Sequence, residues 1–393
     1  MTNICVTTGI GVVLPNTRSL EKLWNDCLGR DESSARSDGK GAQGFVSEEL
    51  FEGCIPPRLS KKLDAFTRYA LAATHFAIED AKLALSEADK ERCGVFVGNC
   101  FGGWRFTEPE LRNLHCDGPR SVSPFQATSW FPAAPQGQIS IHYGLKGYSK
   151  TFMADRASSL LSISAAAQQI KQGNLDIAIA GGTESTNTDF VKAALRRLKK
   201  DRDGDDDAFS PFAPGRDGFA VSEGAVFIVM ESERHARARG AKIYGRVEDF
   251  VIRNSPCDTD EYGADPIPFI QSMKGVCNGA APDLTLPDAC GFSDCDRAEA
   301  HAISEVFDDV KITYPKARLK HLFGAEGALD VALSCLMLER QQILPTFVDE
   351  IGPPLKPTQV ARELIDARLD RILINARASG GAVGSLVVSR MEA

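Results

Sequence analysis

Short runs of apolar and β-branched residues alternate along the chain with longer segments in which apolar residues recur every three or four positions. The short runs predict buried strands, and the longer segments predict helices with one apolar face. The expected strands are 4–7 together with 10–13, 93–98, 176–181, 224–231, 245–252, 284–288, 311–313, 371–375 and 383–389. The expected helices are 18–28, 60–86, 158–172, 187–199, 296–307, 325–340 and 358–366.

Strands that alternate with long helices indicate an α/β fold in which largely parallel sheets are buried between helices. The length of 393 residues permits one large domain or two ordinary ones with a substantial core. The pattern alone therefore predicts a layered α/β protein made of one or two halves.

Composition narrows the class of protein. Hydrophobic residues make up 43% and charged residues 25%, as in a soluble globular protein. The net charge of −8 gives no electrostatic case for binding nucleic acid or an anionic membrane, and no apolar run reaches the length of a membrane span. The eleven cysteines form no C-x-x-C pair, and the six histidines show no metal-ligand spacing. We therefore expect reduced thiols, a cytoplasmic location, no metal and no cofactor.

A series of motifs in the same order closely resembles the β-ketoacyl synthases of the thiolase superfamily. The motifs are VTTGIGVVLPN near the start, DAFTRYALAATHFAIEDA, VGNCFGG, PFAPGRDGFAVSEGA, RHARARGAKIYG, ACGFSDCDRAEAHAI, PKARLKHLFGAEGALDVA and NARASGGAVGSLVV. The resemblance implies a thiolase-like fold: two similar halves stacked as five α/β layers (αβαβα), with the active site between them. The halves would comprise residues 1–241 and 242–393.

The position of the family's nucleophile is altered. In the family a segment of roughly T-A-C-A-S-S carries the Cys that holds the acyl chain, whereas residues 154–159 here read Ala-Asp-Arg-Ala-Ser-Ser. Arg156 cannot be deprotonated in a protein and cannot form a thioester. Arg156 could be an ion-paired plug of the acyl tunnel, could pair with a carboxylate at a subunit interface, or could have no selected role.

Two other catalytic positions of the family also bear on whether this chain is an active enzyme. Cys290 stands where the family has its first catalytic His, whereas Lys316 and His321 retain the second His motif. The gating G-F-G-G motif is replaced by residues 376–379 before two glycines. We expect a degenerate site at Arg156, Cys290, Lys316 and His321 with no catalytic residue. The alternatives are an active condensing enzyme, or a residual malonyl decarboxylase, that uses Cys290 or His321.

Within the superfamily the chain resembles the chain-length factor, or ketosynthase β subunit, of type II polyketide synthases. The segment from Trp130 to Ile141 is similar to that subunit's W-F-Y-A-x-x-x-G-Q-I-S-I motif, and Asp296 to Ala300 retain D-R-A-E-A. Two features depart from the pattern: many chain-length factors have Gln where Arg156 stands, and His321 is closer to a ketosynthase. An aromatic and a polyene pathway both remain open.

The resemblance implies a non-catalytic, chain-length-determining subunit that forms a heterodimer with an active ketosynthase and receives chains from an acyl carrier protein. The strand near 150–154 would lie at the interface, and the helix after Gly103 would line a tunnel. The expected interface residues are Trp130, Phe131, Pro132, Pro135 and Phe152, and the expected tunnel residues are Phe106, Pro109 and Asn113, which share one helical face. Ordinary packing of these residues and a non-catalytic scaffold that docks acyl carrier protein are the alternatives.

Overall fold

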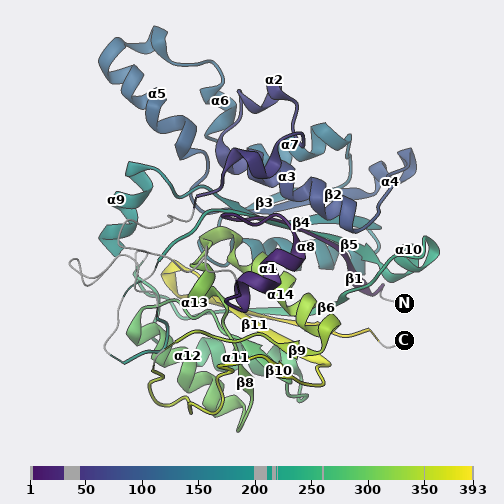
Figure 1. The fold of residues 1–393 in the computed structure, drawn as a ribbon, viewed down its shortest axis with the longest axis vertical. Coiled ribbons are helices and arrows are strands. Elements are labelled where there is room, and N and C mark those ends of the chain that lie inside the picture. Colours follow the sequence, from purple (N-terminus) through teal and green to yellow (C-terminus); the bar gives the residue numbers. More distant parts are fainter. Residues whose placement is uncertain are drawn as a thin grey trace.

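The computed structural model describes residues 3–30, 45–198, 210–214, 218, 220–258, 261–348 and 350–391. Ten strands form a continuous sheet in the order β3-β2-β4-β5-β1-β6-β12-β11-β7-β8 (Figure 1). The strands are β1 Cys5–Val13, β2 Cys93–Gly98, β3 Lys150–Phe152, β4 Ile177–Glu184, β5 Gly224–Ser232, β6 Gly245–Asn254, β7 Leu284–Leu286, β8 Lys311–Ile312, β11 Arg371–Arg377 and β12 Ala382–Ser389, beside a separate pair, β9 Gln342–Ile343 and β10 Ile365–Asp366. The helices are α1 Leu20–Cys27, α2 Pro57–Ser60, α3 Ala65–Asp80, α4 Glu87–Glu91, α5 Trp104–Asp117, α6 Gln126–Ser129, α7 Ala134–Tyr143, α8 Ser158–Lys171, α9 Asp189–Leu198, α10 Glu233–Ala238, α11 Ile267–Cys277, α12 Ser293–Val306, α13 Lys316–Leu319 and α14 Glu326–Arg340.

The sheet consists of two halves with the same topology. In the first half β3, β2 and β4 are parallel neighbours, and β5 is antiparallel to both β4 and β1. In the second half β8, β7 and β11 are parallel neighbours, and β12 is antiparallel to both β11 and β6. Within the sheet of the described residues, the halves are paired through β1 and β6, with Val6 opposite Arg246 and Thr7 opposite Gly245. This duplication confirms the expected two similar halves.

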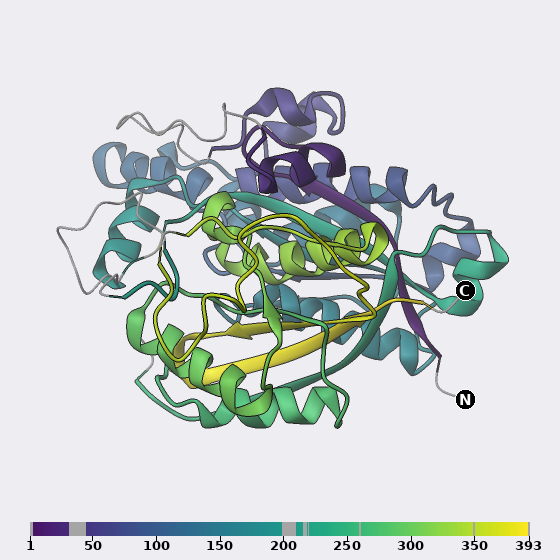
Figure 2. The same ribbon diagram turned by 60° about the horizontal axis from the view of Figure 1, so that its bottom comes forward.

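The helices complete five layers. Helices α8 and α14 pack against each other and against strands of both halves, so they form the central layer. Helices α3 and α7 cover the outer face of the first half, and α11 and α12 cover the outer face of the second (Figures 1 and 2). Residues 328–338 of α14 are buried on every side, as expected for a helix between two sheets. The thiolase-like αβαβα architecture is therefore confirmed.

Two glycines bring α8 and the segment before α14 close to the sheet. A Cβ atom on Gly98, at the end of β2, would lie 2.3 Å from the backbone nitrogen of Ser159. A Cβ atom on Gly182, in β4, would lie 2.7 Å from the Cα atom of Ala325. Only glycine allows such close approach, and the segments held in this way carry the residues of the candidate site.

Some sequence-based expectations are wrong. The sheets are mixed instead of largely parallel, because β5 and β12 each pair in antiparallel fashion on both sides. The helix expected at 358–366 is not formed. Instead, Val360 bridges to Ile312 of β8, and the nitrogen of Ile312 donates to the carbonyl oxygen of Gln359. The expected helix 60–86 is shorter, since α3 ends at Asp80. The proposed division at residues 241 and 242 falls between α10 and β6 and stays a prediction.

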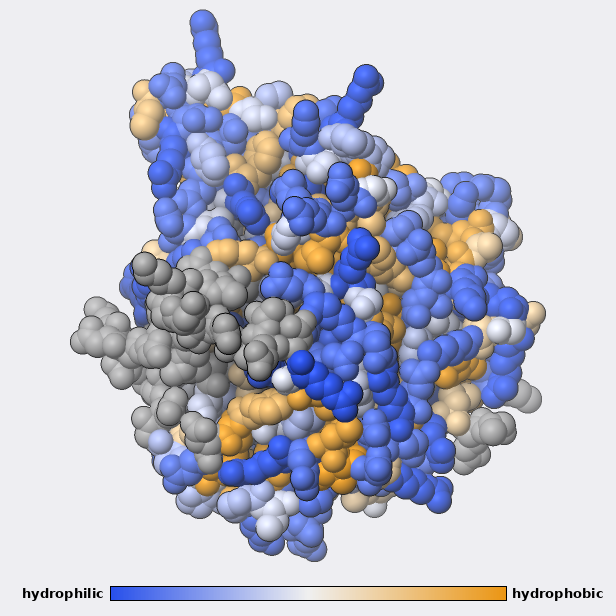
Figure 3. Space-filling view, viewed as in Figure 1, coloured by the Kyte–Doolittle hydropathy of each residue, from blue (hydrophilic) through white to orange (hydrophobic). Residues whose placement is uncertain are grey.

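No helix in the described ranges is both long and apolar enough to cross a membrane. The face of the molecule in Figure 3 is mostly hydrophilic, with apolar side chains in separate small groups.

Candidate functional site: a buried arginine cluster between the halves

The candidate site lies where β3 leads into the central helix α8. Asp155 has a positive φ of 47°, and this turn directs the next residue, Arg156, toward the second half of the molecule. The hydroxyl of Ser158 donates to the carbonyl oxygen of Asp155 at 2.6 Å and accepts from the nitrogen of Ala154 at 2.8 Å, which fixes the turn. Arg156 is 1% exposed.

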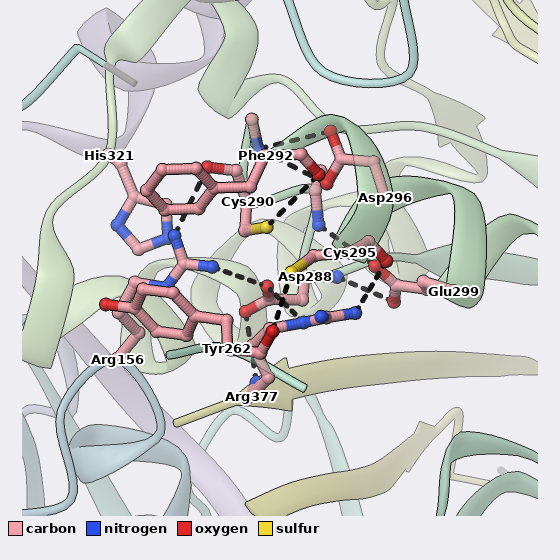
Figure 4. A network of polar contacts seen from close by, with 12 residues as sticks. Arg156, Tyr262, Asp288, Cys290, Phe292, Cys295, Asp296, Glu299, His321 and Arg377 are labelled. Atoms are coloured by element: carbon pink, nitrogen blue, oxygen red, sulfur yellow. Dashed lines mark hydrogen bonds and ion pairs between the residues drawn. The ribbon is translucent and has the colours of Figure 1, made fainter. Parts of the chain in front are cut away.

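The guanidinium of Arg156 has partners on three sides (Figure 4). Nη2 lies 2.8 Å from Oδ2 of Asp288, and Nη1 donates to the carbonyl oxygen of Cys290 at 3.3 Å. The ring of Tyr262 covers the guanidinium, with its centroid 4.6 Å away, in a cation–π contact. Burial alone would lower the pKa of Arg156, but Asp288 together with Cys290, Tyr262 and Asp155 outweighs burial, so the pKa is raised. The positive charge of Arg156 lies just before the N-terminus of α8, which is the positive end of the helix dipole, so its position there is unfavourable. The negative charge of Asp288 compensates for this cost.

Asp288 also binds a second buried arginine, Arg377, at the end of β11. The nitrogen of Arg377 donates to Oδ1 of Asp288 at 3.1 Å, and its Nε lies 3.3 Å from Oδ2. The remaining nitrogens of Arg377 donate to the carbonyl oxygens of Gly263 and Cys295, at 2.9 and 2.8 Å. One buried carboxylate therefore holds two arginines from opposite halves of the molecule, since a buried charge must be paired to be tolerated.

Cys290 lies in the loop between β7 and α12 and is fully buried. Burial raises the pKa of its thiol well above the usual value. Cys290 precedes α12 by three positions, so it lacks the helix N-terminus that lowers the pKa of a reactive cysteine. A second buried thiol, that of Cys295 in the first turn of α12, donates to the carbonyl oxygen of Tyr262 at 3.0 Å.

Lys316 and His321 border the same cluster. Nζ of Lys316 lies 2.7 Å from Oδ2 of Asp330 and 3.5 Å from Oε1 of Glu326. Burial alone would lower the pKa of Lys316, but these carboxylates raise it. Nδ1 of His321 accepts from the nitrogen of Phe323 at 2.8 Å, so the ring proton lies on Nε2. Burial, followed by Arg156 and Lys316, lowers the pKa of His321 well below 6.5.

The structure therefore brings together the four residues that the sequence singled out: Arg156, Cys290, Lys316 and His321. By the resemblance described above, a permanent cation would occupy the position of the family's thiolate, a thiol of raised pKa that of the first His, and a neutral imidazole that of the second. A condensing site needs a nucleophile of lowered pKa and donors that stabilise an oxyanion. The arrangement at Arg156 instead excludes a nucleophile from this position.

The expected tunnel residues lie on α5, which projects from the body of the molecule (Figure 1). Thr107 is the one fully buried residue of this helix. Phe106 and Asn113 are half-buried and Pro109 is exposed. A tunnel along this face would therefore need a second wall supplied from outside the chain.

The expected interface residues lie partly on the surface. Trp130 and Phe131 are 50% and 51% exposed, Pro132 and Phe152 are half-buried, and Pro135 is buried within the chain. Phe152 belongs to β3, the outermost strand of the sheet. Twelve large apolar side chains in the described part of the chain are exposed by more than a third, and eight of them lie between Leu111 and Met153. They are Leu111, Leu114, Phe125, Trp130, Phe131, Ile141, Tyr148 and Met153.

Sequence reasoning did not identify Asp288, Tyr262 or the ion-pairing role of Arg377. A signal for Arg377 was present, because an arginine at the end of the apolar run ILINAR is costly to bury without a partner. Nothing comparable marked Tyr262, which approaches the site from a loop more than a hundred residues away from Arg156.

Comparison with known protein families and sequences identifies the family of this chain. The family model of the β-ketoacyl synthase N-terminal domain matches residues 2–236, and that of the C-terminal domain matches residues 285–348. The chain is 31% identical, over 98% of both chains, to the tetracenomycin polyketide synthase ketoacyl synthase beta subunit of Streptomyces glaucescens. It is 29% identical, over 98% of both chains, to 3-oxoacyl-acyl-carrier-protein synthase 2 of Coxiella burnetii.

Solved structures share the fold. A β-ketoacyl synthase from Burkholderia phymatum superimposes with a TM-score of 0.88 at 22% identity, over 99% of this chain and 100% of that one. The ishigamide ketosynthase/chain length factor superimposes with a TM-score of 0.86 at 22% identity, over 100% of both. A type II polyketide synthase acyl carrier protein in complex with its ketosynthase gives 0.77 at 25% identity, over 99% and 100%. The chain belongs to the β-ketoacyl synthase family, on the branch of the ketosynthase β subunits, or chain-length factors, of type II polyketide synthases.

Proposed function

We propose that this chain is the non-catalytic subunit of a type II polyketide synthase that sets the length of the polyketide made by an active ketosynthase partner. The observation that carries the proposal is the buried pair of Arg156 and Asp288 at the position of the nucleophile. An enzyme that had lost its thiol by drift would have no reason to hold the replacement with a buried carboxylate from the other half.

The exposed apolar surface supports a partner. Eight of the twelve exposed apolar side chains lie in one segment of the chain, and edge strand β3 lies within that segment. Exposed large apolar side chains beside an unpaired strand edge are typical of a protein–protein interface. The partner is a catalytic ketosynthase whose own edge strand pairs with Lys150–Phe152, giving a heterodimer with pseudo-two-fold symmetry.

The position of α5 supports a role in chain length. The helix carries few contacts within its own chain, so its half-buried face at Phe106 can form one wall of a tunnel that the partner closes. The growing chain would be attached to the partner and extended with malonyl units carried by an acyl carrier protein. Its far end would stop against this wall.

The eleven unpaired cysteines fit the reducing cytoplasm in which we place the complex.

Reconstitution tests the proposal. The chain, an active ketosynthase of a type II polyketide synthase as the candidate partner, and the pair are each incubated with malonyl-acyl carrier protein, and the products are measured by mass spectrometry. We expect a polyketide of defined length from the pair and no condensation by the chain alone. Condensation, carbon dioxide release or a covalent acyl label on the isolated chain would contradict the proposal and favour an active enzyme. Failure of the two proteins to co-purify would contradict the partnership.

A further inference from the structure

Helix α5 is bonded to the body of the molecule at its first turn. The backbone nitrogen of Phe106 donates to Oδ2 of Asp64 at 2.5 Å, and Nη1 of Arg105 donates to the hydroxyl of Tyr69 at 2.9 Å. Further along the helix stands Pro109, which lacks the N–H that would bond to the carbonyl oxygen of Arg105. The part beyond this proline projects from the body (Figure 1). The direction of α5 therefore depends on the bonds of its first turn.

The carboxylate of Asp64 caps two helices at once. Its Oδ1 accepts from the nitrogen of Phe66 at 3.0 Å, which makes Asp64 the N-cap of α3, while Oδ2 accepts from the third residue of α5, Phe106. The N-cap of α5 itself is Gly103, which has no side chain to offer. A Cβ atom on Gly103 would lie 2.0 Å from the carbonyl oxygen of Ser129, so a local cap does not fit. Asp64 therefore supplies the acceptor that α5 lacks, at the positive ends of two helix dipoles.

The surroundings of Asp64 keep both of its oxygens available as acceptors. The residue is 1% exposed, so water does not compete for the two N–H groups. Burial raises the pKa of the carboxyl to about 6, against the opposing effect of the two backbone N–H groups, Arg68 and Arg105. Asp64 is therefore ionised at neutral pH, and a carboxylate has an oxygen for each helix.

We propose that Asp64 is a positioning residue for chain length, because its carboxylate fixes the first turn of α5 and so holds the ring of Phe106 at the end of the tunnel. The inference rests on the proposed function, in which Phe106 forms the wall. Phe106 is bonded through its own backbone nitrogen, so a change in this bond moves its ring directly. Pro109 and Asn113 lie further along the projecting part. A wall that is not held by Asp64 would stop growing chains at several depths.

Amide exchange tests the positioning, and it needs no ketosynthase. Asn and Ser cap a helix as well as Asp does, so Asp64→Asn and Asp64→Ser keep the cap of α3, but each offers one side-chain oxygen in place of two. We expect hydrogen–deuterium exchange at the nitrogen of Phe106, resolved by mass spectrometry of the full chain, to become at least about tenfold faster, as for the loss of a hydrogen bond to a charged group. An unchanged exchange rate in both variants would overturn the proposal.

Product length then separates this inference from the proposed function. In the reconstituted pair, we expect the Asp64 variants to add chains that are shorter or longer by a two-carbon unit to the main product. Ser86→Ala removes the side-chain cap of α4, on another side of the molecule (Figure 1), and is the control for lost stability. It should keep the single length, and the same broadening from Ser86→Ala would overturn the role of Asp64.

Phe106→Ala completes the comparison. If Phe106→Ala changed the length but both Asp64 variants kept it, the positioning role would be wrong and the proposed function would stand. If neither Phe106→Ala nor the Asp64 variants changed the length, α5 would not set it, and the proposed function would fail together with this inference.

Discussion

Nη2 of Arg156 lies 2.8 Å from Oδ2 of Asp288, and this ion pair connects the two halves of the molecule across their buried boundary. Arg156 precedes the central helix of the first half, whereas Asp288 follows a strand of the second. Both side chains are at most 3% exposed, so water does not screen the pair.

Removal of the negative charge of Asp288 should destabilise the folded protein. Asp288→Ala leaves Arg156 and Arg377 as uncompensated buried cations, and we expect a loss of about 3–5 kcal/mol in the free energy of unfolding, measured by urea titration. Asp370→Ala, which removes an exposed carboxylate paired with Arg390, is the control and should change stability far less, because solvent screens that pair. Equal effects of the two variants would contradict the structural role of Asp288.

Restoring the family's thiol should not restore chemistry. Arg156→Cys supplies a nucleophile, but Cys290 still occupies the position of the family's first catalytic His, so one of the two imidazoles that stabilise the enolate is missing. We expect no condensation above background in a radiolabelled malonyl assay, with an intact ketosynthase as the positive control. Robust product from Arg156→Cys alone would mean that the rest of the site is competent.

The apolar surface should be needed for the partner. Phe131→Asp places a charge at the centre of the proposed interface, and we expect co-purification with the ketosynthase to fall by at least about 30-fold, as for a hot spot of about 2 kcal/mol. Ile267→Asp is the matched control, since Ile267 is 53% exposed, close to the 51% of Phe131, but lies on α11 in the other half. If both variants retained the partner equally, this surface would not be the interface.

Side-chain volume on α5 should set product length. Phe106→Ala moves the end of the proposed tunnel outward, so we expect the bound chain to grow by one or more two-carbon units. Because loss of a half-buried ring also reduces stability, the readout is product length by mass spectrometry instead of yield. Arg112→Ala truncates an exposed side chain on another face of α5, outside the apolar set, and should leave length unchanged. An unaltered product from the Phe106 variant would exclude this wall.

Stability should depend on pH through His321. Its folded-state pKa is well below the usual 6.5, so below pH 6.5 the unfolded chain takes up a proton that the folded chain does not. This contribution is present above pH 6.5 and is lost as the pH falls. We expect the free energy of unfolding to fall by on the order of 1 kcal/mol between pH 7.5 and 5.5. His321→Asn retains an acceptor for the nitrogen of Phe323 but has no group that titrates in this range. Its free energy of unfolding, measured by urea titration, should therefore fall less between pH 7.5 and 5.5 than that of the unmodified chain. Parallel pH profiles would contradict a buried neutral imidazole.

The sequence by itself determined the α/β class and the main alteration of the site, and the resemblance of its motifs implied the five-layer architecture. Alternating apolar runs and periodic segments are local signals, because each strand or buried helix must carry its own apolar face. The arginine at position 156 is likewise visible in one motif, and its chemistry follows from the side chain alone.

Only the tertiary structure decided what surrounds that arginine. Asp288, Tyr262 and Arg377 are brought to Arg156 from distant segments by the stacking of the two halves. The failure of the helix expected at 358–366 has the same cause, since the backbone near Val360 is paired with β8. Local patterns fix the type of element, but the partner of a buried charge or of an edge backbone is set by contacts between residues far apart in the chain.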